Sequence, residues 1–317
     1  MWTICRKELA DHFSSTRFLI LFCLILMVAL VSTYLAAASV REALEGTSKP
    51  SQVFLLLFTT PFSEKFFSVA QFIAFFGPLL GIIMGFDAIN RERQHRTLAK
   101  LVSQPIFRDA VINGKFLAGA FTISIALLSL LLLLSGIGLM AVGVVPGQEE
   151  IGRLVLYLII SIAYVSFWMG LAILFSILFR SLATSALASV ALWIVFSFFI
   201  GFASDLVAGA FAPVKNPRDP EEIVANHRLA GAISLASPAV LYSQATSTIL
   251  DPYRRTRNSL VLTGPMERMS LERFQNPLPL DQSILVVWPY LTFLAALTLI
   301  CFGLSYTIFM RQEIRSV

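Results

Sequence analysis

Six long runs without a charged residue limit what this chain can fold into more than any other feature. Each run exceeds the roughly 20 residues that an α-helix needs to cross the hydrocarbon core of a bilayer. Charged residues make up only 14% of the 317 residues, against roughly 25% in an ordinary soluble domain. The sequence therefore predicts an all-α polytopic membrane protein with a single transmembrane domain over 1–317, and it places the six spans at 18–38, 66–86, 116–145, 154–179, 183–204 and 285–309.

A shorter apolar stretch, 53–62, ends at Pro61 and is followed by Glu64 and Lys65. About ten apolar residues are too few to span a bilayer. We expect this stretch to lie at the membrane interface, and the alternative is a plain loop packed on the outer surface.

The distribution of basic residues predicts the orientation. Short cytoplasmic loops keep Lys and Arg, whereas long translocated segments largely escape this rule. On one side of the membrane, basic residues outnumber acidic ones by twelve to six, while the short loops opposite have a small acidic excess and segment 205–281 is balanced. We therefore expect both termini to be cytoplasmic, in a multi-pass protein of the cytoplasmic membrane. The net charge of +5 then reflects topology and not nucleic-acid binding.

The start of the chain resembles a secretory signal, since a basic beginning and an apolar run are followed by Ala36-Ala37-Ala38. That run is longer than the roughly 7 to 15 apolar residues of a signal. We expect an uncleaved first span.

Several kinds of chemistry are missing from the sequence. The predicted spans hold no carboxylate or histidine of the kind that ion-coupled carriers use, and there is no GxxxxGK[ST] phosphate loop. The three histidines, His12, His95 and His227, are isolated and fit no metal-binding spacing. We expect no catalytic, cofactor-binding or metal site in this chain, and so no enzyme.

The segment between the second and third spans, 87–115, has the most informative pattern. It can form a mixed-charge helix with a small apolar patch at Leu98, Leu101 and Val102, which Pro105 would stop. Such a helix, held between two spans, is suited to dock on a cytoplasmic partner. An ordinary basic loop that enforces topology is equally compatible with the charges.

A resemblance favours the docking helix. The segment reads Glu92-x-x-x-Arg96-Thr97-Leu98-x-x-Leu101-x-x-x-Pro105-x-x-Arg108, followed by Gly114-Lys115. This arrangement resembles the E-x-x-x-G-T-L-x-x-L-x-x-x-P-x-x-R and G-K pattern of ABC-2 type transporter permeases, with Arg96 in place of the usual glycine. The opening Arg6-Lys7-Glu8-Leu9 is similar to that of the family. The last span and its flanks are similar to a subgroup that includes the permease of the nitrous oxide reductase maturation transporter.

The resemblance implies a six-span permease of type-2 ABC exporter architecture. Such a permease pairs with a second copy or a paralogue and with two ABC ATPase subunits, so that ATP and Mg belong to the ATPases. Segment 87–115 would be the coupling helix. The residues expected to meet the ATPase or to hold the segment are Arg91, Glu92, Arg93, Thr97, Leu98, Leu101, Pro105 and Arg108; local ion pairs and simple packing remain the alternative roles.

The first 17 residues form a second candidate element. Trp2, Cys5, Leu9 and Phe13 recur at the spacing of one helix face, which predicts an amphipathic helix lying on the inner leaflet. In the family such a helix lies beside the ATPase; a simple membrane anchor is the alternative.

A long outer segment, 205–284, separates the last two spans. Ser237-Pro238 predicts a helix start that ends near Asp251-Pro252. The segment is a platform for an extracytoplasmic partner, a gate over the exit, or an interfacial hairpin that caps the dimer.

We therefore expect the transmembrane permease subunit of an ABC transporter, which moves a substrate with ATP hydrolysed by separate subunits. Two alternatives stay open. The first is a membrane subunit that passes mechanical work to an extracytoplasmic partner without moving cargo, and the second is a channel or receptor without an ATPase. Spans rich in Phe, Leu and Ser do not identify a substrate.

Overall fold

The computed structural model describes residues 1–45, 53–60, 68–94, 107–214, 216, 219–252 and 278–312. In these ranges every regular element is helical, and six helices are long and apolar enough to cross a membrane. This confirms the predicted fold class. The six are α2 (Thr16–Glu45), α4 (Val69–Gly85) with its continuation α5 (Asn90–Gln94), α7 (Arg108–Val142), α8 (Gln148–Leu178), α9 (Leu182–Ile194) with its continuations η1 (Val195–Phe199) and α10 (Ile200–Phe211), and α14 (Leu280–Arg311).

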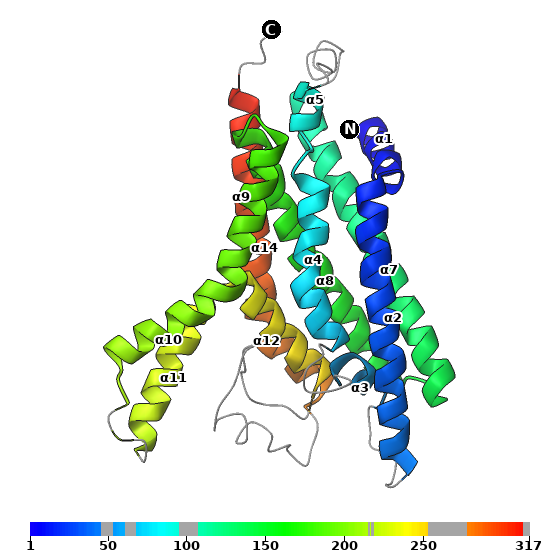
Figure 1. Cartoon of the computed structure of the whole chain (residues 1–317), viewed down its shortest axis with the longest axis vertical. Helices are drawn as coiled ribbons and strands as arrows, with labels where there is room; N and C mark the ends of the chain where they lie inside the picture. The colour runs from blue at the N-terminus through cyan, green and yellow to red at the C-terminus, as the bar shows by residue number, and fades with distance from the viewer. Residues whose placement is uncertain are drawn as a thin grey trace.

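The described residues form four further helices, which pack around the bundle: α1 (Trp2–Phe13), α3 (Val53–Thr59), α11 (Pro220–Ser234) and α12 (Pro238–Leu250). Figure 1 shows α1, α5 and the close of α14 at one end of the bundle, which we call the α1 end. It shows α3 and α12 toward the opposite end, which we call the α3 end, where α10 and α11 lean away from the other helices.

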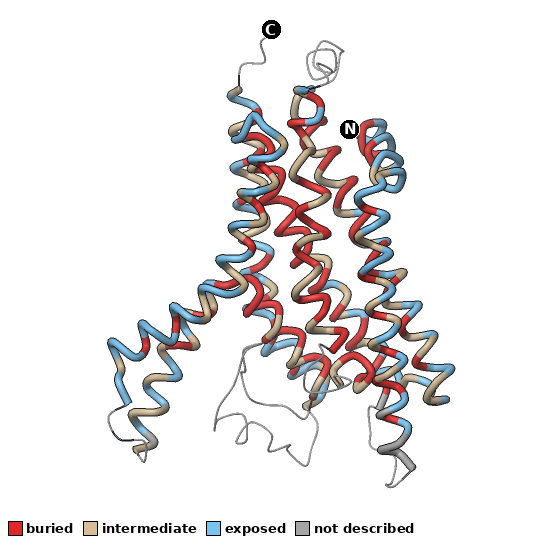
Figure 2. Tube along the Cα trace, in the orientation of Figure 1, coloured by how far each residue is buried: buried red, intermediate tan, exposed pale blue. Residues whose placement is uncertain are grey.

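The centre of the bundle is α8, and glycines let α4 approach it closely. Gly77, Gly81 and Gly85 recur every four residues along one face of α4. A Cβ at Gly85 would lie 2.5 Å from the Met169 carbonyl oxygen, and one at Gly81 would clash with the Val165 carbonyl. Small residues at this spacing are the usual way for membrane helices to bring their backbones together. Buried residues accordingly concentrate on α4 and α8 (Figure 2).

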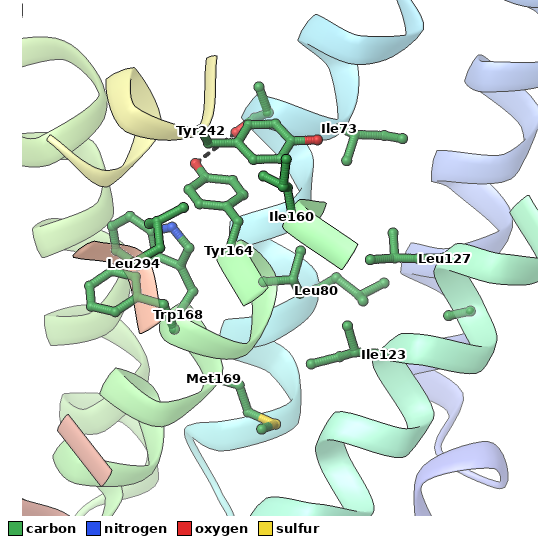
Figure 3. Close-up of a cluster of buried hydrophobic side chains, with 14 of the residues drawn as sticks. Ile73, Leu80, Ile123, Leu127, Ile160, Tyr164, Trp168, Met169, Tyr242 and Leu294 are labelled. Carbon is green, nitrogen blue, oxygen red and sulfur yellow. Dashed lines mark hydrogen bonds between the residues drawn. The ribbon is translucent and has the colours of Figure 1, made fainter. Parts of the chain in front are cut away.

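The core around α8 is apolar with a few hydroxyls (Figure 3). Tyr164 of α8 stacks on Tyr242 of α12 with ring centroids 4.3 Å apart. The Tyr242 hydroxyl pairs with Ser161 Oγ at 2.8 Å, and the Tyr164 hydroxyl donates to the Ala74 carbonyl at 2.9 Å. Helix α12 is therefore seated in the bundle by both aromatic and polar contacts.

The expected helix after Ser237 is present as α12, with Ser237 Oγ accepting from the Val240 amide. Its Tyr242, Ala245 and Ile249 are fully buried, since it packs against α8 and α14. This part of segment 205–284 therefore needs no core of its own, because α12 shares the core of the bundle.

The loop alternative for 53–62 is wrong, because Val53–Thr59 form helix α3. Phe54, Leu55, Leu57 and Phe58 are each at most 2% exposed, and the helix packs on α2, α4 and α8. A helix too short to span is buried here by its neighbours.

Each of the six long helices runs past its predicted span at one end or both. Helix α7 begins at Arg108, whereas the predicted span begins at 116, so it includes Gly114 and Lys115. The predicted span 183–204 corresponds to a helix that passes through the π-helical turn η1 and continues to Phe211.

Candidate functional site

At the α1 end, helix α1 lies directly against the first turns of α7. Ile4 and Cys5 of α1 are buried, and a Cβ at Gly114 of α7 would lie 3.0 Å from Ile4 Cγ2 and 3.3 Å from the Met1 carbonyl oxygen. A side chain at position 114 would push α1 away. The glycine of the Gly114-Lys115 pair therefore permits this close contact.

Lys115 lies beside this contact and joins three helices. Its ammonium is 3.0 Å from Glu8 Oε2 of α1 and 3.0 Å from Glu92 Oε1 of α5. All three side chains are at most 11% exposed. A buried ammonium needs charge partners because desolvation is costly, and here two carboxylates from opposite sides supply them. We call Glu8, Lys115 and Glu92 the lysine triad.

A second basic side chain extends the ion pairing on α1. Lys7 lies 3.2 Å from Glu8 Oε1 and 3.4 Å from Asp11. Burial alone would raise the pKa of the Glu8 carboxyl, but the ammonium groups of Lys115 and Lys7 outweigh it and hold that pKa below its ordinary value. Glu8 is therefore a carboxylate at neutral pH.

A neighbouring network ties α5 and the start of α7 to the close of α14. Arg93 donates to the Ile177 carbonyl at 3.2 Å and also to the side-chain oxygen of Gln312. Arg108 donates to the Gln312 carbonyl at 3.2 Å, and Gln312 Nε2 donates to the Ile177 carbonyl at 3.1 Å. The two described ends of segment 87–115, which are α5 and the start of α7, thus both bind Gln312. We call these two ends the stems of the segment.

The stem formed by α5 is also held by α8 and α9. The amides of Ile89 and Asn90 donate to Ser176 Oγ at 3.0 and 3.1 Å. Ser185 Oγ donates to the Phe86 carbonyl at 2.9 Å. These bonds satisfy backbone groups where α4 gives way to α5, as buried polar groups require.

The predicted coupling residues divide into two groups. Glu92, Arg93 and Arg108 lie in the networks above, and Arg91 is exposed beside them. The remaining four lie outside the described residues: Thr97, Leu98, Leu101 and Pro105.

The four residues predicted to form one face of α1 differ in how far they are exposed. Trp2 and Phe13 are 67% and 38% exposed, whereas Cys5 is 3% exposed and Leu9 is half-buried. Trp2 meets Phe121 of α7 edge to face at 6.4 Å. The outer part of the face is available to lipid, and the inner part packs on α7.

Glu8, Lys115 and Gln312 were not among the predicted site residues. One signal for Lys115 was present, since a cation at the start of a long apolar run is costly unless it is paired. Nothing local indicated its partners, which are distant in the sequence.

A different buried cation lies at the α3 end. Arg153 of α8 is fully buried. It binds Glu149 at 2.8 Å, donates to the Ile249 carbonyl at 2.9 Å and to Ser283 Oγ at 3.2 Å, and donates to the Leu278 carbonyl. These contacts join α8 to the end of α12 and the start of α14, and we call them the arginine clasp.

Next to the arginine clasp, Glu150 fixes α3. It accepts from the Phe54 amide at 3.0 Å and from the Gly147 amide at 2.8 Å. Among the described residues no cluster of His, Cys, Asp and Glu could hold a metal ion.

Comparison with known proteins places these features in a family. Over 128 residues, the chain is 30% identical to the probable ABC transporter permease protein NosY of Pseudomonas aeruginosa and 28% identical to that of Stutzerimonas stutzeri. The aligned stretch covers 40% of this chain and 42% and 41% of those relatives, so it spans less than half of their length. The family model of the ABC-2 family transporter proteins matches residues 2–314. The chain therefore belongs to the ABC-2 family transporter proteins.

Proposed function

We propose that this chain is the transmembrane permease subunit of an ABC transporter, and that it moves a substrate across the cytoplasmic membrane with ATP hydrolysed by two separate ATPase subunits. Family membership across residues 2–314 supports a permease subunit. The chain itself carries no catalysis in this proposal, and ATP and Mg are bound by the partner ATPases.

The α1 end faces the cytoplasm in this proposal. Its exposed or partly exposed basic residues include Arg6, Lys7, Arg17, Arg91 and Arg180, in keeping with the retention of basic residues in cytoplasmic loops. The ATPases then bind there, because nucleotide is found inside the cell. Both termini are cytoplasmic on the same grounds.

The lysine triad is the observation that carries the proposal. Force applied by an ATPase to the segment between α5 and α7 would reach Glu92 on one stem and Lys115 on the other. Through Glu8 it would also reach α1. The triad makes these three elements one charged unit, and α5 passes a displacement on to α4, which it continues, and to α8, to which it is hydrogen-bonded.

A permease of this kind works as a pair, and the partner is a second copy of the chain or a paralogue. The exposed apolar side chains of α9, η1 and α10, among them Leu187, Phe198, Phe202 and Phe211, provide surface for lipid and for such a partner.

The test is reconstitution of the chain with and without its ATPase. The purified chain alone should hydrolyse no ATP, and the complex should do so. Replacing Lys115 by Met should leave ATPase binding largely intact but uncouple hydrolysis from transport. Intrinsic ATPase activity in a clean preparation of the chain would refute the proposal.

One observation favours a second function, in which mechanical work is passed to an extracytoplasmic partner without cargo. The arginine clasp links α8 rigidly to both ends of the segment between α12 and α14. A shift of α8 would therefore move Ile249 at the end of α12 and Leu278 before α14. An outer partner whose loss abolishes function, with no measurable movement of any substrate, would favour this alternative.

A further inference from the structure

An open apolar groove lies between α2 and α7 toward the α3 end. Its volume is about 540 Å³, and its walls are four residues of α2 between Leu30 and Leu35 and three of α7, namely Ile137, Met140 and Ala141. This volume falls within the roughly 300 to 1,000 Å³ of small-molecule pockets. Val31, Tyr34 and Met140 are 54%, 64% and 88% exposed, so the groove opens on the outer surface of the bundle.

A small residue on α7 widens the groove, because Ala141 contributes only a methyl group to its wall. Nearer the α1 end the two helices close, because Phe22 and Ile25 of α2 pack toward Leu127 and Leu130 of α7 around a residual volume of about 10 Å³. The groove is thus confined to one stretch of the helix pair.

The surroundings of the groove indicate what fills it. Both walls belong to helices that span the membrane, so its open side faces lipid and not water. Tyr34, a residue type that favours the boundary between apolar and polar layers, lies at its wall.

Arg41 lies seven residues beyond Tyr34 on the same helix and is exposed. Two turns of helix place the two residues on one face, about 10 Å apart along the axis. Side chains on a helix lean in general toward its N-terminus, and from Arg41 this is the direction in which Tyr34 and the groove lie. A guanidinium matches the geometry of a phosphate group.

From these observations we propose that the groove binds a phospholipid, with one acyl chain between α2 and α7 and its phosphate at Arg41. The order of apolar wall, phenol and guanidinium along α2 follows the order of acyl chain, glycerol ester and phosphate in such a lipid. The site needs only the membrane and this chain, so it does not depend on the ATPase partner.

Photolabelling of the full-length chain tests the proposal. The chain is reconstituted in phosphatidylcholine vesicles that contain a trace of phosphatidylcholine with a diazirine in one acyl chain, and adducts are mapped by mass spectrometry. Adducts should concentrate at Val31, Tyr34 and Met140 relative to the similarly exposed Leu285 and Trp288 of α14, which are 74% and 59% exposed. Equal labelling of both surfaces would mean ordinary lipid contact and would overturn the proposal.

Two variants locate the acyl chain and the phosphate. Val31→Trp should fill the groove and abolish its excess labelling, whereas Val286→Trp, which adds the same bulk at a 47% exposed position of α14, should not. Arg41→Gln should lower the labelling by up to about fivefold, since one exposed pair of opposite charges contributes at most about that factor to binding; Arg41→Lys should retain part of it.

Three results would contradict the proposal. The two tryptophan variants could behave alike, Arg41→Gln could label as the wild type does, or the groove could be covered by a second copy of the chain and remain unlabelled. If Val31→Trp does not fold, the adduct map of the wild type and the labelling of Arg41→Gln still test the proposal. Position 41 is exposed, so the substitution there does not disturb the packed core.

Discussion

The two ends of the bundle each bury a basic side chain, but with different partners. Lys115 at the α1 end shares its ammonium between the carboxylates of Glu8 and Glu92. Arg153 at the α3 end uses one carboxylate, two backbone carbonyls and a hydroxyl. An ammonium is a compact charge on a flexible stem, whereas a guanidinium is a planar fork with fixed donor directions.

This difference suggests a division of labour. Carboxylates on flexible side chains can follow a moving ammonium, so the lysine triad can hold α1, α5 and α7 together while they shift. Backbone carbonyls cannot follow, so the arginine clasp fixes α12 and α14 to α8. We propose that mechanical work enters at the α1 end, which we call the adjustable end, and is delivered through the α3 end, which we call the fixed end.

The largest effect should come from breaking the fixed end. Arg153→Met leaves the Ile249 and Leu278 carbonyls without their donor, whereas the Glu149 side chain, which is 45% exposed, can be hydrated; each carbonyl left unpaired costs about 1 to 3 kcal/mol. We expect that loss in the free energy of unfolding in mixed micelles. Arg228→Met on α11, where the side chain is exposed, is the control and should change little; similar losses in both variants would refute the clasp.

A smaller loss is expected at the adjustable end. Lys115→Met leaves two carboxylates facing each other, but one can take up a proton, which limits the cost to about 2 kcal/mol. Helix α1 should then loosen, so the Cys5 thiol, now 3% exposed, should react with a maleimide much faster.

Adding Glu8→Gln to Lys115→Met should recover part of the lost stability, because one of the two facing charges is removed. A double variant as unstable as the sum of the two single variants would show that Glu8 and Lys115 do not interact.

If work passes from the α1 end to the α3 end, the packing of α4 on α8 between them must be rigid. Gly81→Ala would place a methyl group against the Val165 carbonyl and 3.0 Å from the Met169 amide nitrogen, and such overpacking costs about 1 to 3 kcal/mol. Gly201→Ala on α10, where a Cβ meets nothing within 4 Å, should be neutral or slightly stabilising. Thermal unfolding of both variants checks this, and a tolerated Gly81→Ala would refute the close packing of α4 on α8.

The smallest effect concerns pH at the α1 end. Because the pKa of Glu8 is lower in the folded chain than its ordinary value, its carboxylate stabilises the fold fully above the unfolded pKa of about 4.3, and the contribution is lost as pH falls through the folded pKa. The unfolding midpoint of the wild type should exceed that of Glu8→Gln at pH 7, and the gap should close below about pH 4. A gap that does not change with pH would mean that Glu8 is not paired.

Sequence alone was sufficient for the architecture because the six apolar runs are local signals. It could not predict that α3 is buried, since burial of a seven-residue helix depends on its neighbours α2, α4 and α8. The lysine triad was missed for a related reason: Glu8, Glu92 and Lys115 lie on three separate helices, and only their folding brings them together. The role of Arg153, which falls in the loop between the predicted spans 116–145 and 154–179, could not be predicted because its main acceptors are backbone carbonyls, which no residue type reveals.

The central claim is that an ATPase engages the α1 end. The most direct test places a photocrosslinking amino acid at Arg91, exposed beside the lysine triad, and at Val145, which is 77% exposed near the opposite end of α7. After illumination of native membranes, mass spectrometry identifies the captured polypeptides. The account predicts an ABC ATPase crosslinked from position 91 and none from position 145. Capture of the ATPase from position 145, or its absence at position 91, would contradict it.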